Sequence, residues 1–185
     1  MKKLLLLALT LSLLVVSLSS CFLTDMIFKE EETTPTSKTF DYNKGFNITL
    51  PPEFEQTSSP MARDLVVQSN DHLVHALPTA FSNITPNEGF DFPTLEIFYS
   101  ESGILGETFT AMQIQEVDGF KTIEFDTDSN GKLDTLFILM ETETAYWAVK
   151  FQPTSKSTVP YEDAKPLYME WAKTISFKLE ETTEK

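Results

Sequence analysis

The two histidines of the chain, His72 and His75, are the side chains best suited to proton transfer or metal binding near neutral pH. They lie three residues apart in a segment, 72–77, that is predicted to be a strand. On a strand this spacing points the two side chains to opposite faces, so they could not share one metal ion. We expect no enzyme here. A hydrolase is the alternative, and it would need a pocket that joins one histidine to an acid and a hydroxyl.

The segment 126–134 carries oxygen-bearing side chains at alternate positions and a glycine at its turn. Hard calcium ions are bound by such oxygens, and the ligands here would be Asp126, Asp128, Asn130 and Asp134. The twelfth position, where a bidentate glutamate belongs, is Phe137, and the flanking segments are predicted strands. A solvated hairpin turn explains the same residues without a metal. We therefore expect no cofactor, with a calcium-binding structural or sensing module as the alternative function.

Cys21, the only cysteine, ends an N-terminal segment with a basic start and an apolar run over residues 4–18. That run is too short for a membrane-spanning helix but fits the apolar region of a signal peptide. The residues before and at the cysteine resemble the lipobox of bacterial lipoproteins: Leu18, Ser19, Ser20 and Cys21. The resemblance implies a signal peptide over residues 1–20, which a signal peptidase recognises through Leu18, Ser19 and Ser20. It also implies lipid chains on the thiol and the freed amine of Cys21.

The lipid chains would anchor the protein to a membrane of the cell envelope, on its extracytoplasmic side. An ordinary secretory signal with a chance cysteine, or a retained transmembrane anchor, would explain the same N-terminus. Residues 21–38 are predicted to be the lipidated cysteine and a disordered tether, because residues 30–37 are acidic and polar. Residues 39–179 are predicted to form one domain, and residues 180–185 a tail.

The acidic composition limits the partners of the chain. Its 185 residues include 14 Lys and Arg against 28 Asp and Glu, for a net charge of -14. Removal of residues 1–20 would take away Lys2 and Lys3 and no acid, which makes the net charge more negative by two. Such a chain repels phosphate, so nucleic acid is excluded as a partner. Anionic headgroups would also repel the domain, which leaves an unknown envelope protein or small ligand as the binding partner.

The domain is predicted to be α+β, an antiparallel meander covered by helices, with a terminal strand that returns to the sheet. Alternating patterns predict strands over residues 45–50, 65–68, 72–77, 110–117, 120–126, 133–140, 146–151 and 174–179, with turns that include residues 69–71 and 118–119. Helical spacing predicts a short helix after Asp91 and a longer helix over residues 159–173. Tyr146 and Trp147 are adjacent on one predicted strand, so one of them should face outward, as a candidate contact like the segment 90–92. The alternative is that most of these aromatic side chains belong to the core.

This order of elements resembles the PsbP-like family, which includes many small bacterial lipoproteins. Three segments carry the resemblance: 45–51 at the start, 117–121 before a pair of strands, and the last helix leading into 175–177. Residues 53–90 match the family pattern poorly. The resemblance implies an adaptor or binding module without catalysis, and it brings no catalytic residues with it.

Overall fold

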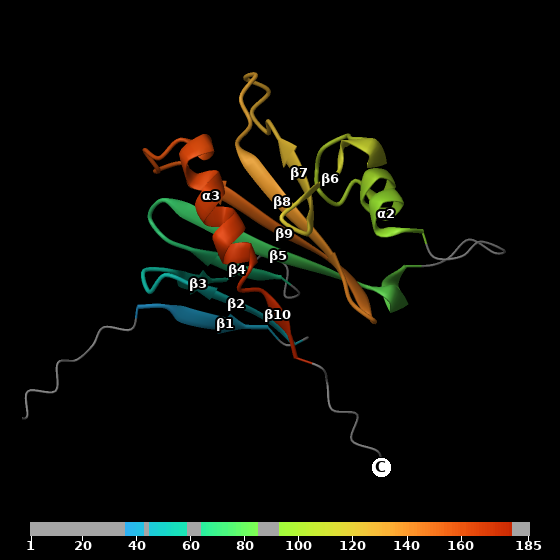
Figure 1. Cartoon of the computed structure of the whole chain (residues 1–185), viewed down its shortest axis with the longest axis horizontal. Coiled ribbons are helices and arrows are strands. Elements are labelled where there is room, and N and C mark those ends of the chain that lie inside the picture. The colour runs from blue at the N-terminus through green and yellow to red at the C-terminus, as the bar shows by residue number, and fades with distance from the viewer. Residues whose placement is uncertain (1–35, 43–44, 59–63, 85–92, 179–185) are drawn as a thin grey trace, which may run out of the picture. The chain divides into compact units, whose positions relative to one another are not determined.

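A computed structural model of the protein describes residues 36–42, 45–58, 64–84 and 93–178 (Figure 1). All the elements below belong to one unit of the chain, which begins at residue 37. The signal peptide, the lipobox, Cys21, most of the tether and the tail predicted from the sequence lie outside the described residues. No helix in the described parts of the chain is long and apolar enough to span a membrane.

The larger of two sheets has seven strands, and every neighbouring pair in it is antiparallel. Its order is β3 (Glu55–Thr57), β4 (Leu65–Gln68), β5 (His72–Ala80), β9 (Ala145–Pro153), β8 (Thr135–Glu141), β7 (Phe120–Phe125) and β6 (Gln115–Val117). The sheet consists of two meanders, β3 to β5 and β6 to β9, which are joined where β5 pairs with β9. This pairing runs from His72 opposite Pro153 to Ala80 opposite Ala145. The predicted antiparallel α+β class is confirmed.

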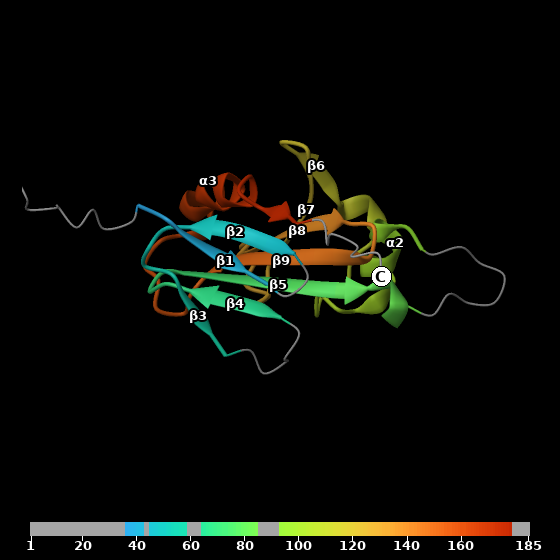
Figure 2. The same cartoon turned by 90° about the horizontal axis from the view of Figure 1, so that it is seen from below.

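A second sheet of three strands packs near the first (Figure 2). It consists of β1 (Lys38–Asp41), β2 (Phe46–Leu50) and β10 (Ser176–Phe177), with β2 in the middle. Neither β1 nor β3 is predicted from the sequence. The predicted terminal strand is present as β10, but it pairs with β2 and does not return to the meander.

Two helices cover the larger sheet, α2 (Leu95–Ser102) and α3 (Tyr161–Ala172). The Thr94 hydroxyl accepts a hydrogen bond from the Ile97 N–H and so begins α2, and Gly103, at a φ of 64°, ends it. Glu162 and Asp163 in the first turn of α3 stabilise the helix N-terminus. Two short 3₁₀ helices, η1 (Phe81–Asn83) and η2 (Ala111–Gln113), lie in the connections.

Both faces of the central strands are covered, because alternate residues belong to two separate clusters. Trp147 packs with β2 and α3, whereas Tyr146 packs under α2, with Leu95 and Tyr99. Trp147 is 1% exposed and Tyr146 3%. The prediction that one of the two faces outward is therefore wrong: a helix or a second sheet covers each face at that strand. The candidate segment 90–92 lies outside the described residues.

The predicted strand over residues 110–117 is only partly correct. Residues 111–113 form η2, and only residues 115–117 pair with β7, as β6. The Thr110 N–H donates a 2.7 Å hydrogen bond to the Gln113 side chain, which is one half of a capping box. This local hydrogen bond competes with the ladder and turns the chain away from β7.

Candidate functional site

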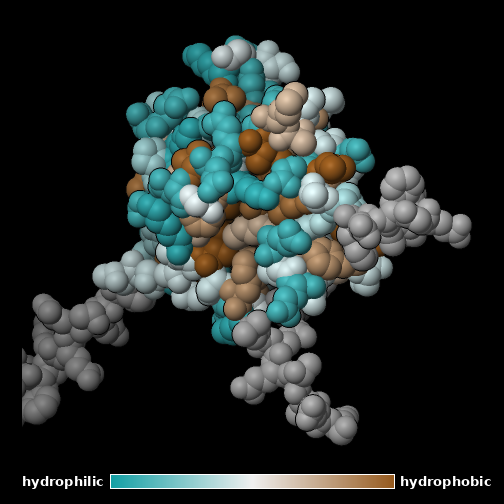
Figure 3. Space-filling model, turned by 45° about the vertical axis from the view of Figure 1, so that its right-hand side comes forward, coloured by the Kyte–Doolittle hydropathy of each residue, from teal (hydrophilic) through white to brown (hydrophobic). Residues whose placement is uncertain are grey.

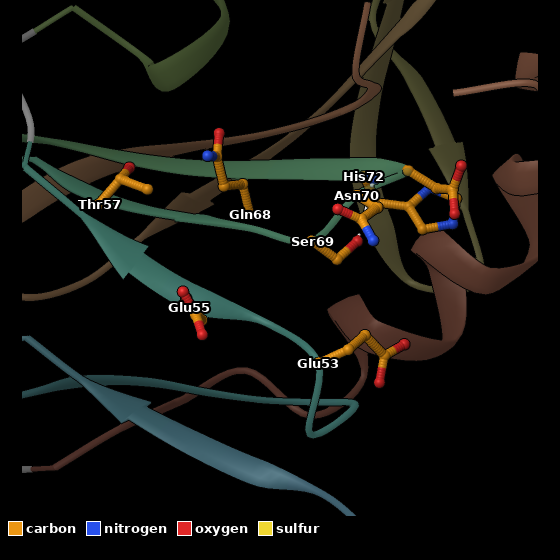
Figure 4. A pocket seen from close by; sticks show the side chains of 8 residues that line it. Glu53, Glu55, Thr57, Gln68, Ser69, Asn70 and His72 are labelled. Carbon is orange, nitrogen blue, oxygen red and sulfur yellow. Dashed lines mark hydrogen bonds between the residues drawn. The ribbon is translucent and has the colours of Figure 1, made fainter. Parts of the chain in front are cut away.

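A polar pocket of about 420 Å³ lies where β3, β4 and β5 come together (Figure 4). Its lining comes from the segment before β3, from β3 and β4, and from the turn before β5: Glu53, Glu55, Thr57, Gln68, Ser69, Asn70, Asp71 and His72. Figure 4 shows Glu53 and the turn residues Ser69, Asn70 and His72 at one end of this pocket. The turn itself was predicted from the sequence, and it presents its polar groups to the pocket.

Three carboxylates give the pocket a negative charge: Glu53, Glu55 and Asp71. Within residues 36–42, 45–58, 64–84 and 93–178, no lysine, arginine or histidine forms an ion pair with any of the three. Carboxylates that lack a protein cation attract a positively charged group from solution. The pocket is therefore suited to a cationic or hydrogen-bond-donating ligand.

His72 closes the end of the pocket that lies against α3. Its Nδ1 shares a 3.1 Å hydrogen bond with the Tyr168 hydroxyl, and its ring makes an edge contact with Trp171 at 5.3 Å between centroids. Burial lowers the pKa of His72 below its ordinary value, and the nearby Asp71 and Glu53 carboxylates oppose that shift. Burial also raises the pKa of Tyr168, so its phenol stays protonated. The His72–Tyr168 pair is therefore neutral at neutral pH.

His75 lies on the opposite face of β5, as its spacing from His72 predicts. Its Nε2 is 3.0 Å from the Asp64 carboxylate, and the register places it beside Lys150 of β9. The prediction that the two histidines point to opposite faces of the strand is confirmed, because one contacts Tyr168 of α3 and the other contacts Asp64.

The pocket does bring a histidine, an acid and a hydroxyl together, which is the arrangement that a hydrolase would need. The serine hydroxyl and the imidazole, however, form hydrogen bonds that stabilise the turn and the contact with α3. The Ser69 hydroxyl accepts from the backbone N–H of His72 at 3.1 Å, and the imidazole is bonded to Tyr168. A nucleophile and its base must themselves be within hydrogen-bond reach. The geometry favours binding over nucleophilic attack.

The four candidate calcium ligands lie in the β7–β8 hairpin, where the side-chain oxygens of three of them, Asp126, Asn130 and Asp134, accept hydrogen bonds from the loop. The Asp126 carboxylate accepts from the Asn130 and Gly131 N–H groups at 3.0 and 2.5 Å. The Asn130 side-chain oxygen accepts from the Lys132 N–H at 2.9 Å, and Asp134 accepts from Thr127 and Thr135. Among the residues that the structure describes, no group of three or more His, Cys, Asp or Glu side chains could hold a metal ion.

Most of the pocket residues carry no signal that sequence reasoning could have used. Glu53 and Glu55 are two of the 28 acidic residues, and their spacing resembles no motif. The contact between His72 and Tyr168 joins residues 96 positions apart, which only the packing of α3 on the sheet reveals. Only the strand 65–68, the turn 69–71 and the strand that follows it could be predicted.

The sequence was also compared with known proteins. A scan against protein-family models matches no family, and a search of curated proteins finds no similar sequence.

Proposed function

We propose that the chain is a lipoprotein of the cell envelope, anchored through lipid on Cys21, whose PsbP-like domain is a non-catalytic binding module. The lipobox residues Leu18, Ser19 and Ser20 before Cys21 support the anchor. The order of elements, from β2 to the last helix and β10, supports the family resemblance. The module binds a ligand or protein partner that carries a positive charge.

One observation carries the binding function: the pocket of about 420 Å³ with three carboxylates that pair with no cation among the described residues. Thr57, Gln68 and Asn70 add hydrogen-bonding groups that could orient a ligand. His72 is neutral, so it adds no positive charge to oppose a cation. A cationic group would regain in this pocket some of the hydrogen bonds that it loses with water.

Spermidine is a suitable first probe, because it carries several ammonium groups on a flexible apolar chain. We expect saturable binding that shifts the amide NMR signals of Ser69, Asn70 and His72. The double variant Glu53→Gln with Asp71→Asn should weaken binding by about thirtyfold or more, since it removes two charged contacts that are each worth about 1 kcal/mol or more. Glu101→Gln, with Glu143→Gln as a second change, is the matched control at two exposed residues outside the pocket, with the same loss of charge.

Equal weakening in both double variants would mean that the net charge alone attracts spermidine, and it would contradict a pocket. Turnover of a simple ester that is lost in Ser69→Ala would replace the binding module with the hydrolase alternative.

The anchor is tested separately by Cys21→Ser. We expect the variant to leave the membrane fraction, because the lipid chains provide the attachment. Full retention of Cys21→Ser in the membrane would contradict lipidation at this residue.

A further inference from the structure

A second groove lies at the opposite edge of the large sheet from the pocket, beside β7. It has a volume of about 440 Å³ and is called the β7-edge groove below. Its walls come from η2, β6, β7 and the β7–β8 hairpin: Met112, Gln113, Gln115, Thr122, Ile123, Glu124 and Leu133. None of these residues lines the acidic pocket, so the two sites can be tested independently.

The floor of the β7-edge groove is a stretch of β7 that pairs with β8 on one side and with no described strand on the other. β6 pairs with only half of β7, and the last pair is Gln115 with Thr122. Before Gln115 the chain turns into η2, so no described strand pairs with the outer side of β7 over Ile123–Phe125. The edge of the sheet is therefore open at the groove.

The geometry of the β6–β7 turn shows which backbone groups face this open edge. Asp118 and Gly119 have φ of 52° and 82°, as in a two-residue type I′ turn, so Val117 and Phe120 form the first hydrogen-bonded pair. In an antiparallel ladder every second residue points its N–H and C=O to the same side. The N–H and C=O groups of Phe120 and Thr122 point to β6. The N–H and C=O groups of Glu124 therefore point to the same side, where β6 is absent and the groove lies.

Apolar side chains line the groove beside the outward N–H and C=O groups of Glu124. Met112 is 92% exposed and Leu133 is 42% exposed, although each would be stabilised by burial. Five large apolar side chains are exposed in the described parts of the chain, and two of them line this groove. On the side of the domain that carries α2, Figure 3 shows hydrophobic side chains at the surface between hydrophilic ones. An extended chain at the edge of β7 would cover such side chains.

The charge around the β7-edge groove selects the kind of chain that it accepts. Glu116 lies on β6, and the neighbouring hairpin carries three acids, Asp126, Asp128 and Asp134, against one lysine, Lys132, so the surroundings are negative. The chain's own segments 30–32 and 180–184 are acidic and would be repelled. A second copy, with its own net charge of -14, would be repelled too. A basic segment is attracted.

We propose that the β7-edge groove binds an extended basic segment of a partner protein, which adds a strand to the sheet at Glu124. The segment pairs with the outward N–H and C=O of Glu124 and packs an apolar side chain against Met112 and Leu133. This binding by strand addition goes beyond the proposed function, because it uses a second site and requires an extended backbone and not only a positive charge.

The probe is an acetylated and amidated heptapeptide of alternating lysine and valine, titrated into the full-length protein in detergent. A matched peptide that is N-methylated at every residue keeps the charge and side chains but loses all its backbone donors. We expect saturable binding of the first peptide with a shift of the Glu124 amide signal. N-methylation should weaken it by about tenfold, since it removes ladder hydrogen bonds of about 1 kcal/mol each.

Variants test the apolar walls of the groove. Met112→Ser should weaken binding of the first peptide severalfold, whereas Leu167→Ser, a matched change at an exposed residue of α3, should leave it unchanged. Both residues are exposed, so both variants are expected to fold.

Three results would overturn the proposal. Equal affinity for both peptides would show attraction by charge alone, and no saturable binding at millimolar peptide would show that the edge accepts no strand. A dimer that the peptide dissociates would show that a second copy occupies the groove. Spermidine binding to the acidic pocket is measured from the amide signals of Ser69, Asn70 and His72, and peptide binding to the groove from the amide signal of Glu124. The failure of one proposal is therefore distinguishable from the failure of the other.

Discussion

Lys178 and Gly45 hold the two ends of the domain together: the N–H of Lys178 donates a 2.7 Å hydrogen bond to the carbonyl oxygen of Gly45. The Asn47 side chain donates a second hydrogen bond, of 2.9 Å, to the same oxygen. These contacts continue the pairing of β10 with β2 and bring the last described residue against the first turn of the domain. Closure of the small sheet therefore depends on the backbone at Gly45.

Gly45→Ala should destabilise the domain. Gly45 has a φ of 79°, and an added Cβ would collide with the backbone oxygen of Lys178, which no side-chain movement can relieve. A loss of about 1–3 kcal/mol in the free energy of unfolding is expected from strain of this kind. Urea denaturation measures it. Gly131→Ala, with a similar φ but open space around its Cβ, separates backbone strain from collision, and equal losses would contradict the role of Lys178.

Glu124→Leu should also destabilise the domain, because Glu124 links β7 to α3. Its carboxylate accepts 2.6 Å hydrogen bonds from both the Tyr161 hydroxyl and the Lys165 ammonium. The variant leaves both partly buried groups without their acceptor, at an expected cost of about 2–4 kcal/mol. Asp41→Leu, which breaks the exposed pair with Lys178, is the control and should cost about 0–1 kcal/mol. Similar shifts in the urea midpoint would contradict a special role for Glu124.

The sequence predicts elements well where local signals agree. The alternation in residues 120–126 and 146–151 and the Asp118-Gly119 turn lead to β7, β9 and the hairpin that the structure contains. The strands β1 and β3 were missed, since Lys38–Asp41 borders a polar segment and Glu55–Thr57 carries no apolar alternation. Both strands depend on pairing with β2 and β4, which is tertiary information.

The candidate site was less predictable than the fold for the same reason. The separation of His72 from His75 follows from strand geometry, and it is confirmed. The pocket carboxylates and Tyr168 come from three different parts of the chain, so only the folded domain brings them to His72.

Acidification should destabilise the domain partly through His72. Because burial lowers the pKa of His72 in the folded state, the unfolded chain binds this proton more readily. This contribution to stability is present above the ordinary pKa of about 6.5 and is lost as the pH falls through the lower folded-state value. His72→Phe keeps the ring contacts with Tyr168 and Trp171 and has no proton to bind.

The melting temperature measured between pH 7.5 and 5 should therefore fall more steeply in the native protein than in His72→Phe. The carboxylates titrate in both proteins, so the difference between the two curves isolates His72. Parallel curves would contradict the lowered pKa.

Calcium should leave the melting temperature unchanged, because Asp126, Asn130 and Asp134 of the hairpin already accept hydrogen bonds within the loop. Both oxygens of Asp126 accept backbone N–H groups. At Asp134, burial alone would raise the pKa, but hydrogen bonds from Thr127 and Thr135 outweigh it and lower the pKa below its ordinary value. The carboxylate thus stays ionised without a metal. To bind calcium, the loop would have to give up some of these hydrogen bonds, each worth about 1 kcal/mol or more.

The measurement is thermal unfolding with millimolar calcium and with a chelator, in the native protein and in Asp128→Ala. A saturable rise in the melting temperature that is absent in Asp128→Ala would contradict this expectation and establish the calcium-binding alternative. A rise of equal size in both proteins would be screening of the net charge of -14 by a divalent ion. Magnesium at the same concentration should then reproduce it, because screening depends on ionic charge and not on the loop's coordination geometry.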